Sequence, residues 1–283
     1  MAFVLALLLL GTIQSKLPTD ADIAKQVENA IRAQLHPANV QVVVCRNSPF
    51  TTTVQRLDIT ISGFTLDGLS LGHGGPATTA MQPVADMAPR NESLQSIPHP
   101  SGRQIRIRDA KIICRDFILK SLTVQELELH IHELRLPLRS VTGGSFAISG
   151  IETVAGSVVL PQQGLTDFLR GHKLPLERPE VVVTPEGCSV KGFYHAALLS
   201  VPVEVTGWLI VKEKAILWLD NPQLKMSHVT LPKFITDRVL KSVNPLVDLN
   251  AELSLPAPLT ITRITHAAGS LRLDAVLNFP PPE

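Results

Sequence analysis

The stretch LTVQELELHIHELRLPL, residues 122–138, carries the pattern that decides the fold. Leu127, Leu129 and Ile131 alternate with glutamate and histidine, which is typical of a β-strand with one apolar and one polar face. From Leu134 onward the apolar residues continue one position out of step. Such a change of phase indicates a β-bulge, in which one extra residue bends the strand. The stretch therefore predicts a long, bent strand that places one face on a core.

The same alternation occurs on both sides of this stretch. Before it, the alternating apolar residues are Val40, Val42 and Val44, then Leu57, Ile59 and Ile61, then Ile105 and Ile107. After it, residues 180–194 predict a hairpin that turns at Pro185-Glu186-Gly187, and residues 201–219 predict a second hairpin that turns near Lys212-Glu213. The last strands are expected at 261–265 and 270–277. An antiparallel meander is the simplest topology for these strands.

Amphipathic helices accompany the strands. In residues 19–35 the apolar residues recur at helical spacing, with Thr19 or Asp20 placed to cap the first turn. This helix should end near His36, because the residue before a proline is disfavoured in a helix. Shorter helical patterns occur at 165–169 and 231–243. We therefore expect an α+β fold, in which a long, strongly curved antiparallel sheet wraps around the first amphipathic helix.

Composition restricts the class of protein. The chain has 283 residues, of which 45% are hydrophobic, 18% are charged and only 4% are aromatic. This is too apolar for intrinsic disorder, and no apolar run reaches the length that spans a bilayer, which excludes a polytopic membrane protein. A net charge of +1 and few aromatic residues provide neither the field nor the stacking platforms of a nucleic-acid-binding protein.

The termini and one internal segment differ from the rest. The apolar run near the start predicts a signal peptide or N-terminal anchor over residues 1–16, and hence export to the periplasm or cell envelope. Residues 72–102 are rich in Pro, Gly, Ser and Thr, which predicts a disordered insertion, with a mobile lid or a domain boundary as the alternatives. We expect a single domain over 17–279 that contains this insertion, followed by a tail at 280–283.

Candidate chemical groups are few. No nucleophile, P-loop, dinucleotide or zinc-protease motif is present, so no catalytic residue and no cofactor is expected. His130 and His132 share a strand face and could hold a metal with a third ligand, but we interpret them as solvated or paired histidines. Asp167 and Asp237 each follow a threonine where a helix is expected to start, which capping explains.

Two further groups of side chains leave alternatives open. The basic residues between Arg106 and Lys120 could face anionic headgroups, and a solvated strand face explains them equally well. The three cysteines, Cys45, Cys114 and Cys188, could form one disulfide, but we interpret them as small buried residues on strands.

The surplus of one-sided aliphatic strands and helices is the strongest functional indication. A lipid-binding groove needs mostly aliphatic walls, whereas an enzyme needs convergent polar groups. The candidate lipid-lining residues are Ile23, Val27, Ile31, Leu57, Ile59, Ile61, Leu127, Leu129 and Ile131.

Three segments carry a family resemblance. They are LPKFITDRVLKSVNPLVDLNAELSLPAPLTITRITHAAGSLRLDA (231–275), GSVVLPQQGLTDFLRGH (156–172) and the helix at 23–35. Taken in chain order, from the first helix to the last strands, they resemble the LmeA-like phospholipid-binding proteins, a bacterial envelope family. The resemblance implies a fold akin to the tubular lipid-binding superfamily, in which a bent antiparallel sheet is rolled around a long helix and holds acyl chains inside. It implies no catalytic residue.

We therefore expect non-enzymatic binding, and by extension transport, of phospholipid or another acyl lipid at the cell envelope, with the membrane surface as a second partner. The first alternative is an envelope scaffold or interaction protein with a filled core and no ligand. A hydrolase of lipid or glycan is the remaining alternative, and it would require a polar cluster formed by residues distant in the sequence.

Overall fold

The fold consists mostly of β-strands. The computed structural model describes residues 19–48, 51, 53–66, 104–119, 121–137, 150–171, 176–196, 199–226, 244–250, 258–277 and 279. The helices in these ranges are α2 (Asp20–Leu35) and α4 (Gln162–Gly171). The strands are β1 (Asn39–Arg46), β2 (Thr53–Ser62), β3 (Thr65–Leu66), β4 (Gln104–Leu119), β5 (Leu122–Pro137), β6 (Thr153–Pro161), β7 (Leu176–Thr184), β8 (Gly187–Ala196), β9 (Leu199–Lys212), β10 (Ile216–Met226), β11 (Val247–Asp248), β12 (Leu259–Ala267) and β13 (Ser270–Leu277).

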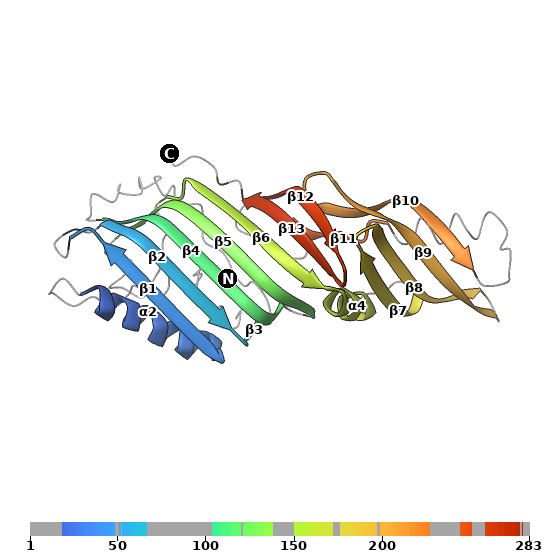
Figure 1. The fold of residues 1–283 in the computed structure, drawn as a ribbon, viewed down its shortest axis with the longest axis horizontal. Coiled ribbons are helices and arrows are strands. Elements are labelled where there is room, and N and C mark those ends of the chain that lie inside the picture. Colours follow the sequence, from blue (N-terminus) through green and yellow to red (C-terminus); the bar gives the residue numbers. More distant parts are fainter. Residues whose placement is uncertain are drawn as a thin grey trace, which may run out of the picture.

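The strands form two sheets that lie end to end along the molecule (Figure 1). The first has the order β1-β2-β4-β5-β6-β13-β12, with β3 paired to β4. The second has the order β11-β10-β9-β8-β7. The C-terminal strand β13 pairs with β6, so the end of the chain completes the sheet that the N-terminal half begins. The predicted strands are present, but they belong to two sheets and not to one.

Two parallel strand pairs, both involving β4, correct the predicted antiparallel meander. β2 and β4 run parallel, with Ile59 beside Ile112, and β3 is also parallel to β4. A parallel pair needs a crossover of a dozen or more residues to return the chain to the same end of the sheet. Residues 67–103, which lie between β3 and β4 in the sequence, are outside the described residues.

The two longest strands change phase together. In β5, Ile131 and Leu134 are both buried, as the sequence predicts, although they are three positions apart and would face opposite sides of a regular strand; Glu133 between them has a φ of +55°. The partner strand β4 changes phase at the same point, where Ile107 and Ala110 are both buried. The register between β4 and β5 is the same before and after this point. The change of phase therefore occurs in both strands together, whereas the predicted β-bulge would add a residue to one strand only.

A second change of phase lies nearer the β4–β5 turn. There, Asp116 has a φ of +49°, and Cys114 and Phe117 on either side are both buried. Phe117 stacks on Phe64, with ring centroids 4.9 Å apart. Positive φ at a non-glycine residue is uncommon and locally increases the bend of a strand. The β4–β5 pair is therefore bent at two places.

Both predicted hairpins of the second sheet are confirmed. β7 and β8 turn at Pro185-Glu186, and β9 and β10 turn at Glu213 and Lys214, which both have positive φ. Two residues with positive φ at a turn match the right-handed twist of the strands that they connect.

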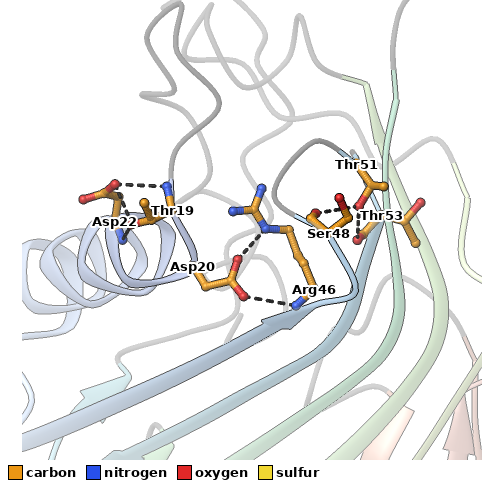
Figure 2. Close-up of polar contacts among 7 residues, drawn as sticks. All are labelled: Thr19, Asp20, Asp22, Arg46, Ser48, Thr51 and Thr53. Atoms are coloured by element: carbon orange, nitrogen blue, oxygen red, sulfur yellow. Dashed lines mark hydrogen bonds and ion pairs between the residues drawn. The ribbon is translucent and has the colours of Figure 1, made fainter.

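Helix α2 begins and ends close to where the sequence predicts. Thr19 is the N-cap and forms a capping box with Asp22, and His36 ends the helix in the left-handed conformation. The main chain and guanidinium of Arg46 in β1 both donate to the carboxylate of Asp20, with an Nε–Oδ1 distance of 2.5 Å (Figure 2). Only 4% of the Arg46 side chain is exposed, so this ion pair anchors the first turn of α2 to β1.

Helix α4 connects the two sheets. It begins at Gln162, three residues earlier than the predicted 165–169, so Thr166 lies inside the helix and not at its start. The buried Thr166 hydroxyl accepts from the Val181 N–H of edge strand β7 at 2.9 Å, and the Gln162 side chain accepts from Val183 N–H at 3.0 Å. These bonds satisfy donors of a sheet edge that would otherwise lie unpaired. Residues of both sheets and both helices form one continuous hydrophobic cluster.

Several predictions concern residues outside the described ranges. These are the N-terminal segment at 1–16, the insertion at 72–102, the helix at 231–243 and the tail at 280–283.

Candidate functional site

The first sheet carries a continuous apolar face, which the register of its strands assembles. Residues paired across strands have their side chains on the same face. The central row consists of Val42, Ile59, Ile112, Leu129, Gly156 and Ala275. The rows beside it consist of Val40, Ile61, Cys114, Leu127, Val158 and Leu273, and of Val44, Leu57, Ala110, Ile131, Val154 and Leu277. We call these three rows the apolar face.

Helix α2 covers one end of the apolar face. The helix packs on β1, and its buried residues Val27 and Ile31 belong to the same cluster as the buried residues of β1 and β2. In Figure 1, α2 lies along β1 at the edge of the sheet. Near α2 the rows are buried, with Ile59 and Ile61 each 1% exposed.

The middle of the apolar face is more accessible. Its half-buried residues in β5, β6 and β13, which we call the open strip, are Leu127, Leu129, Val158, Ala275 and Leu277. Gly156 lies in the same row as Leu129, and a Cβ there would approach Leu129 Cδ2 to 2.7 Å and the Glu128 carbonyl oxygen to 2.8 Å. The glycine therefore lets Leu129 lie flat across β6. At the far end, α4 packs closely against β5.

The structure brings all nine predicted lining residues into one hydrophobic cluster. The buried ones are Ile23, Val27, Ile31, Leu57, Ile59, Ile61 and Ile131, and the half-buried ones are Leu127 and Leu129. The three on α2 pack from the helix side, and the other six lie on the apolar face. Whether any of them contacts a lipid stays a prediction.

Three residues of the open strip were not among the predicted lining residues. Val158 lies in β6, and Ala275 and Leu277 lie in β13. The alternation in SLRLDAVL predicts the strand and its apolar side. The sequence pattern does not say that this strand pairs with β6, which is the contact that brings Leu277 beside Val154.

The opposite face of the first sheet is polar and charge-paired. Lys111 Nζ lies 2.5 Å from Glu128 Oε1, Arg115 Nε lies 3.0 Å from Glu126 Oε2, and Arg106 pairs with Glu133. The Lys111 ammonium is the main cause that lowers the pKa of Glu128. Cross-strand ion pairs thus account for most of the basic stretch, which favours the solvated-face interpretation over a headgroup site.

The two histidines also have carboxylate partners. His130 Nε2 lies 2.8 Å from Glu128 Oε1, and His132 Nδ1 lies 2.7 Å from Asp109 Oδ1. Within the described residues no group of three or more His, Cys, Asp or Glu is arranged to hold a metal ion. The two carboxylate contacts agree with the interpretation of His130 and His132 as paired residues.

The other candidate groups serve the fold. The Asp167 carboxylate accepts from Gln163 at 3.0 Å within α4; it caps no helix, because the helix starts earlier than predicted. Asp237 lies outside the described residues. Cys114 and Cys188 are buried free thiols, but Cys45 is exposed, which corrects its predicted burial. It lies between Val44 and Arg46 on a strand whose alternation turns it outward.

The arrangement is suited to apolar contact. The open strip consists of aliphatic side chains, and the charged groups of the same strands lie on the other face. Such a surface can hold hydrocarbon but offers no group to transfer a proton or attack a substrate. In the described parts of the chain, no helix is both long and apolar enough to cross a bilayer.

Comparison with known proteins agrees with this arrangement. No curated protein and no solved structure matches the chain. The sequence model of one family, described as LmeA-like phospholipid-binding, matches residues 101–276, which run from just before β4 into β13 and include every residue of the open strip except Leu277. This is more than half of the chain, and the chain therefore belongs to the LmeA-like phospholipid-binding family.

Proposed function

We propose that this protein binds a phospholipid, or another lipid with acyl chains, along the open strip of its apolar face, without catalysis. The observation that carries the proposal is a half-buried aliphatic strip of which all residues but Leu277 lie in the part of the chain that matches the phospholipid-binding family. Leu127, Leu129 and Val158 offer the side-chain surface that a hydrocarbon chain would cover.

The proposal includes a curved, tube-like arrangement of the first sheet around the acyl chains, with α2 closing one end. The two changes of phase in β4 and β5, at Asp116 and Glu133, support the curvature. The residues already buried under α2, such as Ile59 and Ile61, would then form the closed end of the groove.

The energy of hydrocarbon burial is sufficient. Each buried methylene contributes about 0.8 kcal/mol. About ten methylenes on the open strip would therefore give roughly micromolar affinity once the loss of translational and rotational freedom is subtracted. Transport of lipid between membranes is an extension of the same proposal, because a non-covalent ligand on a half-open face can leave it.

Two measurements test the proposal. Organic extraction of the purified protein followed by mass spectrometry should recover lipid, and a fluorescent phosphatidylcholine or phosphatidylglycerol should bind. Val158→Gln places an amide on the open strip and should weaken binding about tenfold, because the amide loses water without gaining a partner. The matched control is Val159→Gln, one residue on, whose side chain lies on the polar face beside Glu126 and Arg272.

The possible results separate the candidate functions. Lipid in the extract and weaker binding only in Val158→Gln would support the proposal. No lipid in the extract and no binding of either probe would overturn it in favour of a scaffold with a filled core. The burial of seven of the nine predicted lining residues is the observation that keeps this second candidate open.

The proposal also places the protein outside the cytoplasm, at the cell envelope. The apolar run at residues 2–10 supports export. Fractionation of cells that express the full chain tests this part separately, and recovery in the cytosolic fraction would contradict it.

A further inference from the structure

The second sheet has a groove of its own, far from the apolar face. The groove has a volume of about 370 Å³ and lies on the outer side of β7, β8, β9 and β10. Pockets that bind small ligands range from about 300 to 1,000 Å³, so the volume is large enough for one. The side chains of the buried core point the other way, as Val190 and Val205 pair on the inner side of the same strands.

The floor of the groove is polar but uncharged. Cross-strand pairing places Ser189, Thr206 and Gln223 in one row on adjacent strands. The Thr206 hydroxyl reaches the main-chain oxygen of Gln223 at 3.5 Å, a marginal distance. In the described part of the protein, no hydrogen bond is formed by the side chains of Ser189, Gln223 or Asn221, which also lines the groove. These donors and acceptors are therefore available to a ligand.

One wall of the groove is an indole ring. Trp208 is 50% exposed, which is unusual for so large an apolar side chain. Its neighbour across the strands is Gly187, where a Cβ would lie 3.9 Å from Trp208 Cδ2 and only 2.8 Å from the carbonyl oxygen of Gly207. The side chain that would fill the space beside the indole is thus absent. The imidazole ring of His266 contacts the indole of Trp208 edge to face, with ring centroids 5.5 Å apart.

The charged residues that line the groove are Glu186, Glu204 and Lys225, and Lys191 lies beside Glu204 just outside the lining. Glu204 lies 4.0 Å from Lys191 on one side, and Lys225 follows on the next strand. The lining thus holds charges of both signs, so a phosphate would find no cluster of cations and a metal ion would find no cluster of carboxylates.

We propose that this groove binds a neutral carbohydrate. A pyranose ring has one face of C–H groups, which packs on an exposed indole, and a rim of hydroxyls, which need paired donors and acceptors. Trp208 supplies the first, and the hydroxyl and amide groups of Ser189, Thr206 and Gln223 supply the second. The sugar is either a free oligosaccharide or the headgroup of a glycolipid, since both present the same chemistry to the groove.

The two tryptophans of the chain provide a direct test. Trp218 lies on the same side of the β9–β10 hairpin, opposite Ile210, with the Lys212 ammonium 4.2 Å from its ring centre, and it does not line the groove. In a full-length Trp218→Phe variant, all tryptophan emission comes from Trp208. Titration of this variant with maltotriose, cellotriose and chitotriose should change the emission for at least one sugar, with saturation below about 10 mM.

Calorimetric titration of the wild type and groove variants completes the test. Trp208→Ala should weaken binding by about tenfold or more, and Gln223→Ala should weaken it several-fold. Trp218→Phe should bind as the wild type does. Because Trp208→Ala also removes the contact with His266, circular dichroism should check its fold, and Gln223→Ala decides the matter if that variant does not fold.

The proposal fails if none of the three sugars binds the wild type at about 10 mM, or if both groove variants bind as well as Trp218→Phe does. Vesicles that carry a glucosyl or galactosyl lipid distinguish the two sources. Binding to these vesicles that free sugar competes away indicates a headgroup, and binding of free sugar alone indicates an oligosaccharide. Phospholipid loading is measured separately, so this result is independent of the apolar face.

Discussion

The three cysteines offer very different amounts of thiol surface. Cys45 is exposed on edge strand β1, whereas Cys114 in β4 and Cys188 in β8 are buried. Burial in apolar surroundings raises the pKa of both buried thiols to about 12, because the thiolate would lose its hydration. The thiolate is the form that reacts with thiol reagents. Cys114 and Cys188 are therefore protected both because reagents cannot reach them and because their thiols stay protonated.

This difference predicts the labelling stoichiometry. In the native protein, DTNB at pH 8 should react with one thiol, and in urea it should react with three. The two buried thiols should react at least about a hundredfold more slowly than Cys45, at the rate at which their strands open. The variant Cys45→Ser should show no fast phase. A second fast thiol in the native protein would contradict the burial of Cys114 or Cys188.

The Lys111–Glu128 pair makes a pH-dependent contribution on the polar face. The pKa of Glu128 is lower in the folded protein than in the unfolded chain, because Lys111 and His130 stabilise its carboxylate. A carboxyl of this kind stabilises the fold fully above its unfolded pKa, about 4.3. The contribution is lost as pH falls through the folded pKa, because the protonated carboxyl no longer forms the ion pair.

We therefore expect Glu128→Gln to be less stable than the wild type at pH 7 and nearly as stable at pH 3. Urea unfolding at a series of pH values measures the difference. In a Lys111→Met background, Glu128→Gln should cause little loss of stability at pH 7, because the cation that pairs with Glu128 is already absent. A gap between wild type and Glu128→Gln that stays constant from pH 7 to pH 3 would show that the ion pair is not its cause.

At the scale of elements, the contact between α4 and β5 depends on one glycine. A Cβ on Gly164 would lie 2.4 Å from the carbonyl oxygen of Thr123 in β5, which is closer than side-chain carbons approach backbone oxygens. The helix must therefore move away from the sheet to accept any side chain there. Since α4 also holds the edge of β7, this movement would strain the hydrogen bonds of Thr166 and Gln162.

Gly164→Ala should consequently destabilise the protein by about 1–3 kcal/mol, although alanine favours helices. The matched control is Gly171→Ala at the end of the same helix, where the nearest atom, Ser121 Oγ, is 3.7 Å away, so that the variant should change stability by less than about 0.5 kcal/mol. Urea denaturation measures both. Equal effects of the two substitutions would indicate that α4 is not packed this closely.

The same elements show how far the sequence determines the fold. Alternation predicted the strands and their buried sides, as for Ile59 and Leu129, because side-chain direction depends only on local geometry. Capping chemistry predicted the start of α2 with Thr19 or Asp20 as the cap, and Thr19 is the N-cap. Alternation does not identify a strand's neighbour, so the parallel β2–β4 pair and the pairing of β13 with β6 were not predicted. The start of α4 was missed because Gln162 and Gln163 carry no capping signal.

For the candidate site, too, the sequence predicts the local pattern but not the contacts between distant segments. Its aliphatic composition was predictable, and Leu127 and Leu129 were correctly placed on the apolar side of β5. Which residues stay half-buried depends on what covers them, and that is decided by contacts between distant segments. The outer groove of the second sheet was not predicted, because Trp208 and Gln223 come together only through register.

At the scale of the molecule, two sheets share one hydrophobic cluster, although they lie end to end (Figure 1). The connections between them are specific. Ile261 N–H of β12 donates to the Lys214 carbonyl at 2.7 Å, Gly269 N–H donates to the Val183 carbonyl at 3.0 Å, and α4 bonds the edge of β7. Separate domains would each enclose a core of their own. The single domain over 17–279 stays a prediction, and the shared cluster makes it testable by unfolding.

A single domain should unfold in one step. Both tryptophans, Trp208 and Trp218, lie in the second sheet, so their fluorescence reports that sheet alone, whereas far-UV circular dichroism reports the strands of both. In urea the two signals should give coincident transitions. Thr166→Val removes the acceptor of the Val181 N–H and should lower stability by about 1–3 kcal/mol, with both signals moving together. A fluorescence transition that separates from the circular dichroism transition, in either protein, would mean that the sheets fold as two units and that the shared cluster contributes little to their coupling.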